Sequence, residues 1–383
     1  MRHGPAKRPF PAHCIAVRRP LKRLQPGLPA FWYHDTEQYR RELEAFWYGR
    51  WIVACREEEV PAAGSWRVVR IGTQEILLLR DGGGKLRAFH NTCRHRGSVL
   101  CPGESGRFAR ERIVCPYHSW TYDLAGKLVA TPRRMGTPDF DPARFPLHAV
   151  QAACWGGFVF VCLSKPRQSF AAFLGQLPDR LGRYNLWDLR IGKRIVADVR
   201  ANWKLLAENF SECFHCPPVH PELCRVVTAY REAGAWGLRG AESRPEYLPG
   251  AATLTMDGSA RIPPFRGLRA QDRRTLYIPA MLPPNLFLNV QPDYVNAHLM
   301  FPTGPESVRI VYDWLFEPEH MPAGDDLEHY TALWEVTNAQ DARNCEWQQR
   351  GLHSRAFRRG NYVPQEFDCH RFAQWVRAGL RRR

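Results

Sequence analysis

The chain has 383 residues, 44% of them hydrophobic, which is enough to bury the cores of two domains. Its formal net charge is +16, but the basic residues are scattered and no recognised nucleic-acid motif accompanies them, so we expect no nucleic-acid partner. No apolar run approaches the ~20 residues that span a bilayer, and no signal-peptide core is present, so no membrane association is expected. Twelve cysteines without such a signal predict reduced thiols in a cytoplasmic protein.

The N-terminal region divides at residue 34. The residues 1–34 contain no acid, seven Lys or Arg and six Pro, a composition that predicts a basic, disordered tail. Asp35-x-x-Gln38 then reads as a capping box, which predicts a helix over 35–50. The apolar residues of that helix, Tyr39 among them, would share one face and pack on the C-terminal domain.

Two regions of different secondary structure follow. Over 51–149, short runs of alternating polarity such as Trp66–Ile71 and Glu75–Arg80 end in glycine-rich turns, which predicts an all-β domain. Over 150–383, strands such as Ser307–Leu315 mix with long helices, which predicts an α+β domain.

Two short motifs inside the first of these regions each supply one thiolate and one imidazole: Cys93-x-His95 and Cys115-x-x-His118. Two thiolates can hold one iron of a [2Fe–2S] cluster and two imidazoles the other, the mixed ligation that distinguishes a Rieske centre from a plant-type ferredoxin. A zinc finger would instead place Cys-x-x-Cys in one half and a His pair in the other. The four residues favour an iron–sulfur site, with a structural zinc site as the alternative.

A second set of metal-ligand residues lies in the α+β region. His215 and His220 bracket a Cys-Pro-Pro turn, and Glu212 stands three residues before His215, a spacing that on a helix places both side chains on one face. Two His and a distant carboxylate form the facial triad of non-haem Fe(II) oxygenases, which leaves positions open for O2 and substrate. The alternative is that His215 caps a helix and His220 is a surface turn residue.

With both sets of residues, the chain resembles the alpha subunits of Rieske non-haem iron ring-hydroxylating and demethylating oxygenases, from Leu28 to the C-terminus. Around the second site, the resemblance rests on Asn202, Trp203, Lys204, Glu208, Asn209, Glu212, His215 and His220. It implies an all-β Rieske domain and a helix-grip (START-like) catalytic domain with a curved antiparallel sheet and a long C-terminal helix. The implied ligands of the [2Fe–2S] cluster are Cys93, His95, Cys115 and His118. The implied ligands of a mononuclear Fe(2+) are His215, His220 and Asp341.

The position of Asp341 in a long helix supports its role as a ligand. Asp325–His353 reads as one helix without an internal proline. One stripe of that helix is apolar or neutral apart from the aspartate, and consists of Trp334, Thr337, Asp341, Cys345, Gln348 and Leu352. Burying an unpaired Asp there would be costly, whereas a metal ion would compensate its charge. The alternative is a surface ion pair of Asp341 with Arg343 or Arg350.

The sequence departs from the family pattern in two places. Nineteen residues separate His95 from Cys115, slightly more than is usual, which predicts an insertion in the polar loop 103–112. Ser119 follows the second cluster His, where the family most often has Gly. Neither departure removes a ligand.

The resemblance also implies how electrons reach the iron. Family members form head-to-tail homotrimers, in which the cluster of one subunit faces the iron of the next. Here Glu212 would link His118 of one subunit to His215 of its neighbour, and Asn209 would lie beside it as a second catalytic residue. NAD(P)H would supply the electrons through a separate flavin or iron–sulfur reductase or ferredoxin. The basic surface is either a docking site for this partner or simply a solvated surface.

The substrate implied by the resemblance is a quaternary ammonium compound. The segments 212–216 and 289–298 look like the branch that acts on glycine betaine and similar compounds, with N-demethylation and release of formaldehyde. Aromatic faces would hold such a cation. Weak candidates for that contact are Trp236, Tyr230, Tyr247, Phe287 and Tyr294. The alternatives are an aromatic-ring hydroxylating dioxygenase or monooxygenase, and a Rieske electron carrier that is not an enzyme.

Overall fold

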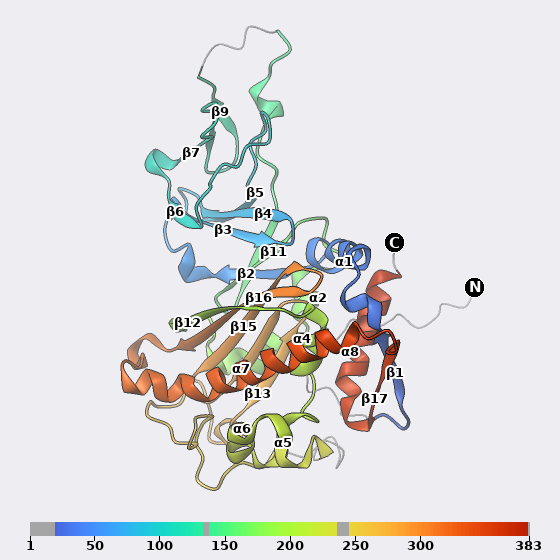
Figure 1. Cartoon of the computed structure of the whole chain (residues 1–383). Helices are drawn as coiled ribbons and strands as arrows, with labels where there is room; N and C mark the ends of the chain where they lie inside the picture. Colours follow the sequence, from blue (N-terminus) through green and yellow to red (C-terminus); the bar gives the residue numbers. More distant parts are fainter. Residues whose placement is uncertain (1–19, 133–137, 236–244, 382–383) are drawn as a thin grey trace, which may run out of the picture. The chain divides into compact units, whose positions relative to one another are not determined.

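The computed structural model describes residues 20–132, 138–235 and 245–381. The chain forms two compact units (Figure 1). Trp47–Phe170 forms the all-β unit, and Met1–Phe46 together with Ala171–Arg383 forms the α+β unit. Every helix in the described parts of the chain is too short or too polar to cross a membrane.

The all-β unit contains small antiparallel sheets. One has the strand order β5-β4-β3-β6 and comprises β3 (Ser65–Ile71), β4 (Gln74–Arg80), β5 (Leu86–His90) and β6 (Ser105–Arg107). A second comprises β7 (Arg112–Val114), β8 (Thr121–Asp123) and β9 (Leu128–Ala130). A third joins β2 (Ile52–Arg56) to the hairpin of β10 (Gln151–Trp155) and β11 (Phe158–Cys162). Because that hairpin pairs with β2, the unit extends to Phe170, past the boundary at 149 that the sequence suggested.

The α+β unit is built on one five-stranded antiparallel sheet with the order β12-β16-β15-β14-β13. Its strands are β12 (Arg190–Val199), β13 (Ile278–Leu282), β14 (Leu286–Val290), β15 (Val295–Gly304) and β16 (Ser307–Phe316). The long helix α7 (Asp325–Leu352) lies across one face of this sheet (Figure 1). The other helices are α2 (Phe170–Leu174), α3 (Leu177–Leu181), α4 (Trp203–Phe210), α5 (Cys216–Val219), α6 (Pro221–Val226) and α8 (Phe367–Leu380). The predicted α+β fold class is confirmed: an all-β unit accompanies a unit of antiparallel sheet and long C-terminal helices.

The expectation of a disordered tail over 1–34 is wrong for its second half. β1 (Gln25–Pro29) pairs antiparallel with β17 (Arg359–Tyr362), and a 3-10 turn follows it over Ala30–Tyr33. Backbone pairing with a distant strand orders this segment, and composition alone gives no sign of such pairing. Residues 1–19 lie outside the described residues.

The N-terminal helix docks on the α+β unit through a buried ion pair. Asp35 caps α1 (Thr36–Glu42) as expected, because its Oδ1 accepts a hydrogen bond from Gln38 N at 2.7 Å. At the end of α1, the buried Glu42 accepts from Lys204 Nζ at 2.7 Å and from Trp203 Nε1 at 2.8 Å. Both ions are fully buried, so each needs the other.

The helix α4 carries the chain from this ion pair to the candidate iron site. Asn202 caps its first turn by accepting from Lys204 N at 3.0 Å, and β12 ends before this residue, at Val199. Near the other end of the helix, the buried Glu208 accepts from Tyr33 Oη at 2.9 Å and from Tyr362 Oη at 2.7 Å. These contacts hold both ends of α4 in a fixed place.

Candidate metal centres

The two cluster motifs lie on loops that share one pattern of backbone hydrogen bonds. In the first, Cys93 N donates to Ser98 O at 2.8 Å and Gly97 N donates to Cys93 O at 3.0 Å. In the second, Cys115 N donates to Trp120 O at 2.9 Å and Ser119 N donates to Cys115 O at 3.0 Å. Each loop thus closes with one bond from residue i to i+5 and one from i+4 to i.

The shared hydrogen-bond pattern requires the same backbone turn in both loops. Gly97 has a φ of 75° and Ser119 a φ of 55°, so both residues occupy the left-handed region. Glycine adopts that region without steric cost, whereas a residue with a Cβ is strained there. This explains physically why glycine suits the position after the second His, where this chain has serine.

The loops place thiols inward and imidazoles outward. Cys93 and Cys115 are buried in the core of the all-β unit, whereas His95 lies at the surface and His118 is half-buried. The two imidazole rings lie 4.7 Å apart, and the His95 ring stacks on Trp120 at 4.8 Å. A [2Fe–2S] cluster with one sulfur-ligated and one nitrogen-ligated iron needs this separation of ligand types. These residues therefore fit a Rieske cluster.

Tyr122 is a contributor to this site that the sequence analysis missed. Its Oη lies 3.3 Å from Cys93 Sγ and accepts from Arg94 N at 3.1 Å. A donor to a ligand sulfur stabilises the electron-rich reduced cluster and so tunes its potential. The alternation of strand β8 gave the only signal, because it turns Tyr122 inward beneath the loops.

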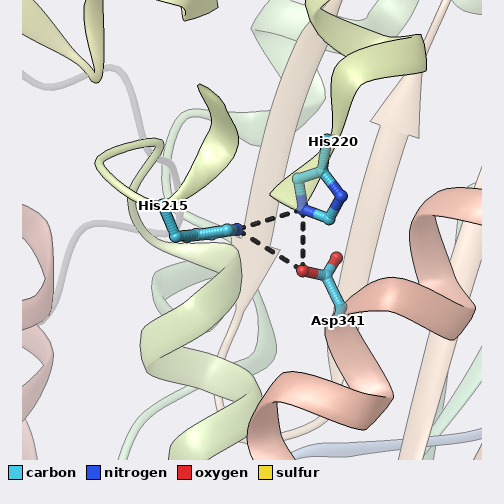
Figure 2. Close-up of side chains that lie close together, drawn as sticks. All are labelled: His215, His220 and Asp341. Carbon is cyan, nitrogen blue, oxygen red and sulfur yellow. Dashed lines mark hydrogen bonds and ion pairs between the residues drawn. The ribbon is translucent and has the colours of Figure 1, made fainter. Parts of the chain in front are cut away.

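The candidate mononuclear iron site joins the two ends of α5 to the middle of α7 in the α+β unit (Figure 2). His215 precedes α5, His220 follows it, and Asp341 lies in the middle of α7. Asp341 Oδ1 lies 2.9 Å from His220 Nε2 and 3.4 Å from His215 Nε2, and the two nitrogens are 3.2 Å apart. The structure therefore brings together the three ligands that the sequence nominated. The partners of the Asp341 carboxylate are these imidazoles, not the surface cations that the alternative interpretation required.

Hydrogen bonds on the far side of each ring fix which nitrogen faces the centre. His215 Nδ1 lies 2.5 Å from Glu212 Oε1, and His220 Nδ1 lies 2.7 Å from Gln340 Oε1. These oxygens can only accept, so each Nδ1 carries a proton, and Nε2 is the nitrogen of each ring that could ligate a metal at the centre. Gln340, which the sequence analysis missed, is itself held by a bond from its Nε2 to Glu222 Oε2 at 2.9 Å. Two imidazoles and a carboxylate so arranged fit a divalent iron.

The pKa values of His215 and Asp341 are both shifted at this site. Burial lowers the pKa of His215, but its hydrogen bonds with Asp341 and Glu212 outweigh burial and raise it to about 10. Burial would raise the pKa of Asp341, yet hydrogen bonds from the two imidazoles hold it well below its usual range. A divalent cation would replace the protons that these groups share, so its binding is expected to release protons.

The two residues nominated as catalytic both contact the ligands. Asn209, at the end of α4, donates from Nδ2 to Asp341 Oδ1 at 3.0 Å. Glu212 contacts His215 as its spacing predicted, but it lies in the loop after α4 rather than on a helix. The carboxylate of Glu212 folds back to accept from the backbone N–H groups of Phe214 and His215, which holds it in place.

Cysteine pairing beside the iron site differs from expectation. A disulfide joins Cys213 to Cys216, one residue on either side of the segment Phe214–His215. The expectation of reduced thiols is therefore wrong for this pair, although the remaining cysteines of the described chain form no disulfide. The two cysteines are three positions apart in the sequence, and a tight turn between them brings their sulfur atoms together.

A pocket adjoins the candidate iron site and holds about 360 Å³ of space free of protein atoms, part of it open to solvent. Its lining residues are Leu206, Asn209, Phe210, Phe287, His298, Met300, Ile310, Tyr312, Asn338, Asp341 and Ala342. Of the four aromatic candidates within the described residues, only Phe287 lines it. Tyr294 is buried in the core, where its hydroxyl donates to Leu254 O, and Tyr230 and Tyr247 also lie outside the lining. Trp236 lies outside the described residues.

The stripe predicted along α7 is wrong at one position. Trp334, Thr337, Cys345 and Leu352 are buried as expected, but Gln348 is exposed and Gln349 is buried in its place. Gln349 accepts from Asn202 N at 2.9 Å and so connects α7 to the start of α4.

Comparison with known proteins agrees with both centres. Residues 186–381 match the family described as the ring hydroxylating alpha subunit (catalytic domain), and residues 50–141 match the Rieske [2Fe-2S] domain. The chain belongs to the family of Rieske non-haem iron oxygenase alpha subunits and is the oxygenase component of such an enzyme. Its cofactors are a Rieske [2Fe–2S] cluster and a mononuclear iron, so the zinc and electron-carrier alternatives are set aside.

Within that family, the chain lies near proteins that act on quaternary ammonium compounds. It is 32% identical to the glycine betaine monooxygenase oxygenase subunit of Chromohalobacter salexigens, over 91% of this chain and 84% of that protein. It is 27% identical to the chloroplastic choline monooxygenase of Spinacia oleracea, over 92% and 78% of the two chains. The fold matches the quaternary ammonium Rieske monooxygenase CntA in complex with gamma-butyrobetaine, with a TM-score of 0.73, 22% identity and coverage of 92% and 96%. It also matches naphthalene 1,2-dioxygenase from Rhodococcus sp., with a TM-score of 0.69, 20% identity and coverage of 93% and 94%.

Proposed function

We propose that this oxygenase hydroxylates an N-methyl group of a small quaternary ammonium compound, such as glycine betaine, and releases formaldehyde. O2 is the oxidant, and NAD(P)H supplies electrons through a separate reductase or ferredoxin. The observation that carries the proposal is an aromatic pocket directly beside Asp341. The names of the relatives above favour the same substrate class.

The walls of the pocket suit a quaternary ammonium head. The rings of Phe210 and Phe287 stack with their centroids 4.8 Å apart, and Tyr312 adds a third aromatic side chain to the lining. A tetraalkylammonium cannot donate a hydrogen bond, so its recognition depends on shape and on contact with aromatic faces. No Lys or Arg is among the lining residues of the described chain, so nothing there repels a cation.

The chemistry balances with two electrons. Hydroxylation consumes the N-methyl substrate, O2, two electrons and two protons, and gives the N-hydroxymethyl cation and water. The bond between nitrogen and the hydroxymethyl carbon then breaks, and the products are the tertiary amine, formaldehyde and a proton. Iron held by the three ligands would supply the O2 chemistry of the first step.

The residues of the chain have separate tasks in this scheme. His215, His220 and Asp341 would hold the iron, and Asn209 would keep the carboxylate of Asp341 in place through its 3.0 Å hydrogen bond. The lining residues would orient the substrate and exclude water.

The electron path would cross between two copies of the chain in a homotrimer. Cys93, His95, Cys115 and His118 would hold the cluster that receives electrons from the reductase. Glu212, already bonded to His215 Nδ1, would accept a second bond from His118 of a neighbouring subunit and so connect the two centres.

Hydroxylation of an aromatic ring is the second candidate. The stacked pair Phe210 and Phe287 would also hold a flat ring, and naphthalene 1,2-dioxygenase shares the fold. The absence of Lys and Arg from the described lining counts against an aromatic acid.

Product analysis with a surrogate reductase separates the two candidates. We expect formaldehyde in proportion to O2 consumed when a trimethylammonium substrate is supplied. Coupled O2 uptake with an aromatic substrate, giving a hydroxylated ring and no formaldehyde, would reject demethylation.

A further inference from the structure

A chain of polar side chains leads across the sheet to the substrate pocket. Tyr277 Oη donates to Asn289 Oδ1 at 2.7 Å, and Asn289 Nδ2 donates to Asn296 Oδ1 at 3.2 Å. The same Asn296 oxygen lies 2.6 Å from Nε2 of His298, which lines the pocket. The strand register explains the arrangement, because Asn289 pairs with Asn296 and Phe287 pairs with His298.

These contacts determine where His298 carries its proton. An amide oxygen can only accept, so the 2.6 Å contact requires a proton on His298 Nε2. Asn289 Nδ2 lies 3.1 Å from that nitrogen, but the shorter contact to an oxygen, which has no proton to give, decides the tautomer. Burial lowers the pKa of His298 to about 3, so the ring stays neutral near pH 7. Nδ1 is then a bare acceptor, and no residue that the structure describes donates to it.

A second polar group of the pocket is a donor. Asn338 lies on α7 one turn before Asp341, and both residues line the pocket. Its Nδ2 is buried and has no hydrogen-bond partner within the described part of the chain. A buried amide donor without a partner costs free energy, which a ligand that accepts from it would recover.

Among its polar groups, which also include Tyr312 and Asn209, the pocket therefore offers a neutral acceptor at His298 and a neutral donor at Asn338, and no Lys or Arg of the described chain lines it. A hydroxyl group can donate to His298 Nδ1 and accept from Asn338 Nδ2. A carboxylate can only accept, so it would meet the lone pair of Nδ1 and would find no Lys or Arg among the lining residues described.

We propose that His298 is a specificity-determining residue that accepts a hydrogen bond from a hydroxyl group of the substrate. The pocket then prefers a hydroxyalkyl quaternary ammonium compound to one that carries a carboxylate. This inference rests on the proposed function, because it assumes a quaternary ammonium head, and it narrows that function away from glycine betaine.

Three compounds that share the trimethylammonium head group test the inference. The compound 2-hydroxyethyl-trimethylammonium carries a hydrogen-bond donor, and carboxymethyl-trimethylammonium carries an anion. The third compound, n-propyl-trimethylammonium, carries neither group. Their dissociation constants are measured by calorimetry under argon on the iron-loaded enzyme. The hydroxyethyl compound is expected to bind about tenfold more tightly than either of the others, the effect of one well-formed buried hydrogen bond.

Two variants of His298 test whether the preference for the hydroxyethyl compound depends on the acceptor atom of this residue. In His298→Leu the preference for the hydroxyethyl over the propyl compound should vanish, and in His298→Gln, which keeps an acceptor oxygen, much of it should return. Iron content and thermal unfolding verify that both variants fold.

Each of the other outcomes overturns a defined claim. Tighter binding of the carboxymethyl compound, or an undiminished hydroxyethyl preference in His298→Leu, would overturn the role of His298 and leave the proposed function standing. Binding of none of the three would overturn the proposed function and this inference with it.

Discussion

The cluster loops and the iron site are built on different principles. Within the all-β unit, two loops of equal hydrogen-bond pattern present all four cluster residues, and backbone bonds set their places. In the α+β unit, the proposed iron ligands come from both ends of the short α5 and from the middle of α7, and side-chain bonds to Glu212 and Gln340 orient the rings.

The difference shows which site depends on the rest of its unit. The position of a cluster loop depends only on the loop's own residues and on the buried residues that it packs against. The iron site requires α4, α5 and α7 to pack correctly, so it is sensitive to contacts far from the metal, such as the buried pair of Glu42 and Lys204. Each site should therefore be removable without loss of the other.

Single ligand changes give the largest effect and test that independence. Cys93→Ser should abolish the Rieske absorption and keep the mononuclear iron, whereas His220→Ala should keep the absorption and lose roughly a third of the iron. Both changes should abolish turnover. Visible absorption and iron analysis after anaerobic purification measure the result.

Two exposed residues provide matched controls for these changes. Cys154→Ser and His353→Ala alter the same residue types away from both sites and should retain both metals. Full iron content and turnover in His220→Ala would reject the facial triad.

Glu212→Gln should interrupt the connection between the two sites without emptying either. Gln keeps the shape of the side chain but loses the charge that accepts from His215 Nδ1. We expect both metals to remain and dithionite to reduce the cluster. Reoxidation of the cluster with substrate and O2 should slow by roughly two or more orders of magnitude, measured in single turnovers. Glu328→Gln, on the exposed side of α7, is the control, and equal reoxidation rates in the two variants would mean that electrons take another route.

The smallest effect concerns the backbone of the second cluster loop. Ser119 occupies the left-handed region with φ 55°, so Ser119→Gly should remove strain and stabilise the all-β unit by up to about 1 kcal/mol. Urea denaturation followed by cluster absorption measures the change. Ser98→Gly, at the neighbouring loop but without a positive φ, should be neutral or destabilising. Destabilisation of Ser119→Gly would mean that the serine side chain contributes more than its strain costs.

Sequence reasoning succeeded where residue type and spacing carry the chemistry. Cys93-x-His95, Cys115-x-x-His118 and the His215 to His220 spacing each predicted neighbours that the structure brings together. Asp341 was found from a helical stripe and a family resemblance, because an aspartate on a largely apolar face needs a partner.

The residues that the sequence did not reveal owe their places in the site to strand register and to how deeply their side chains are buried. Tyr312 and His298 become neighbours of Phe287 only through the pairing of β14, β15 and β16, which spacing along the chain does not reveal. Tyr294, a candidate by residue type, is turned into the core and holds Trp334 instead. The segment 20–34 was misjudged for the same reason, since its order comes from pairing with β17.

Complementation between two inactive variants tests the central claim most directly. Chains with Cys93→Ser lack the cluster, and chains with His220→Ala lack the mononuclear iron, so neither should turn over alone. If the cluster of one chain serves the iron of another, oligomers that contain both variants, isolated through two different affinity tags, will regain substrate-dependent O2 consumption. Verified mixed oligomers without any turnover would contradict electron transfer between chains through Glu212.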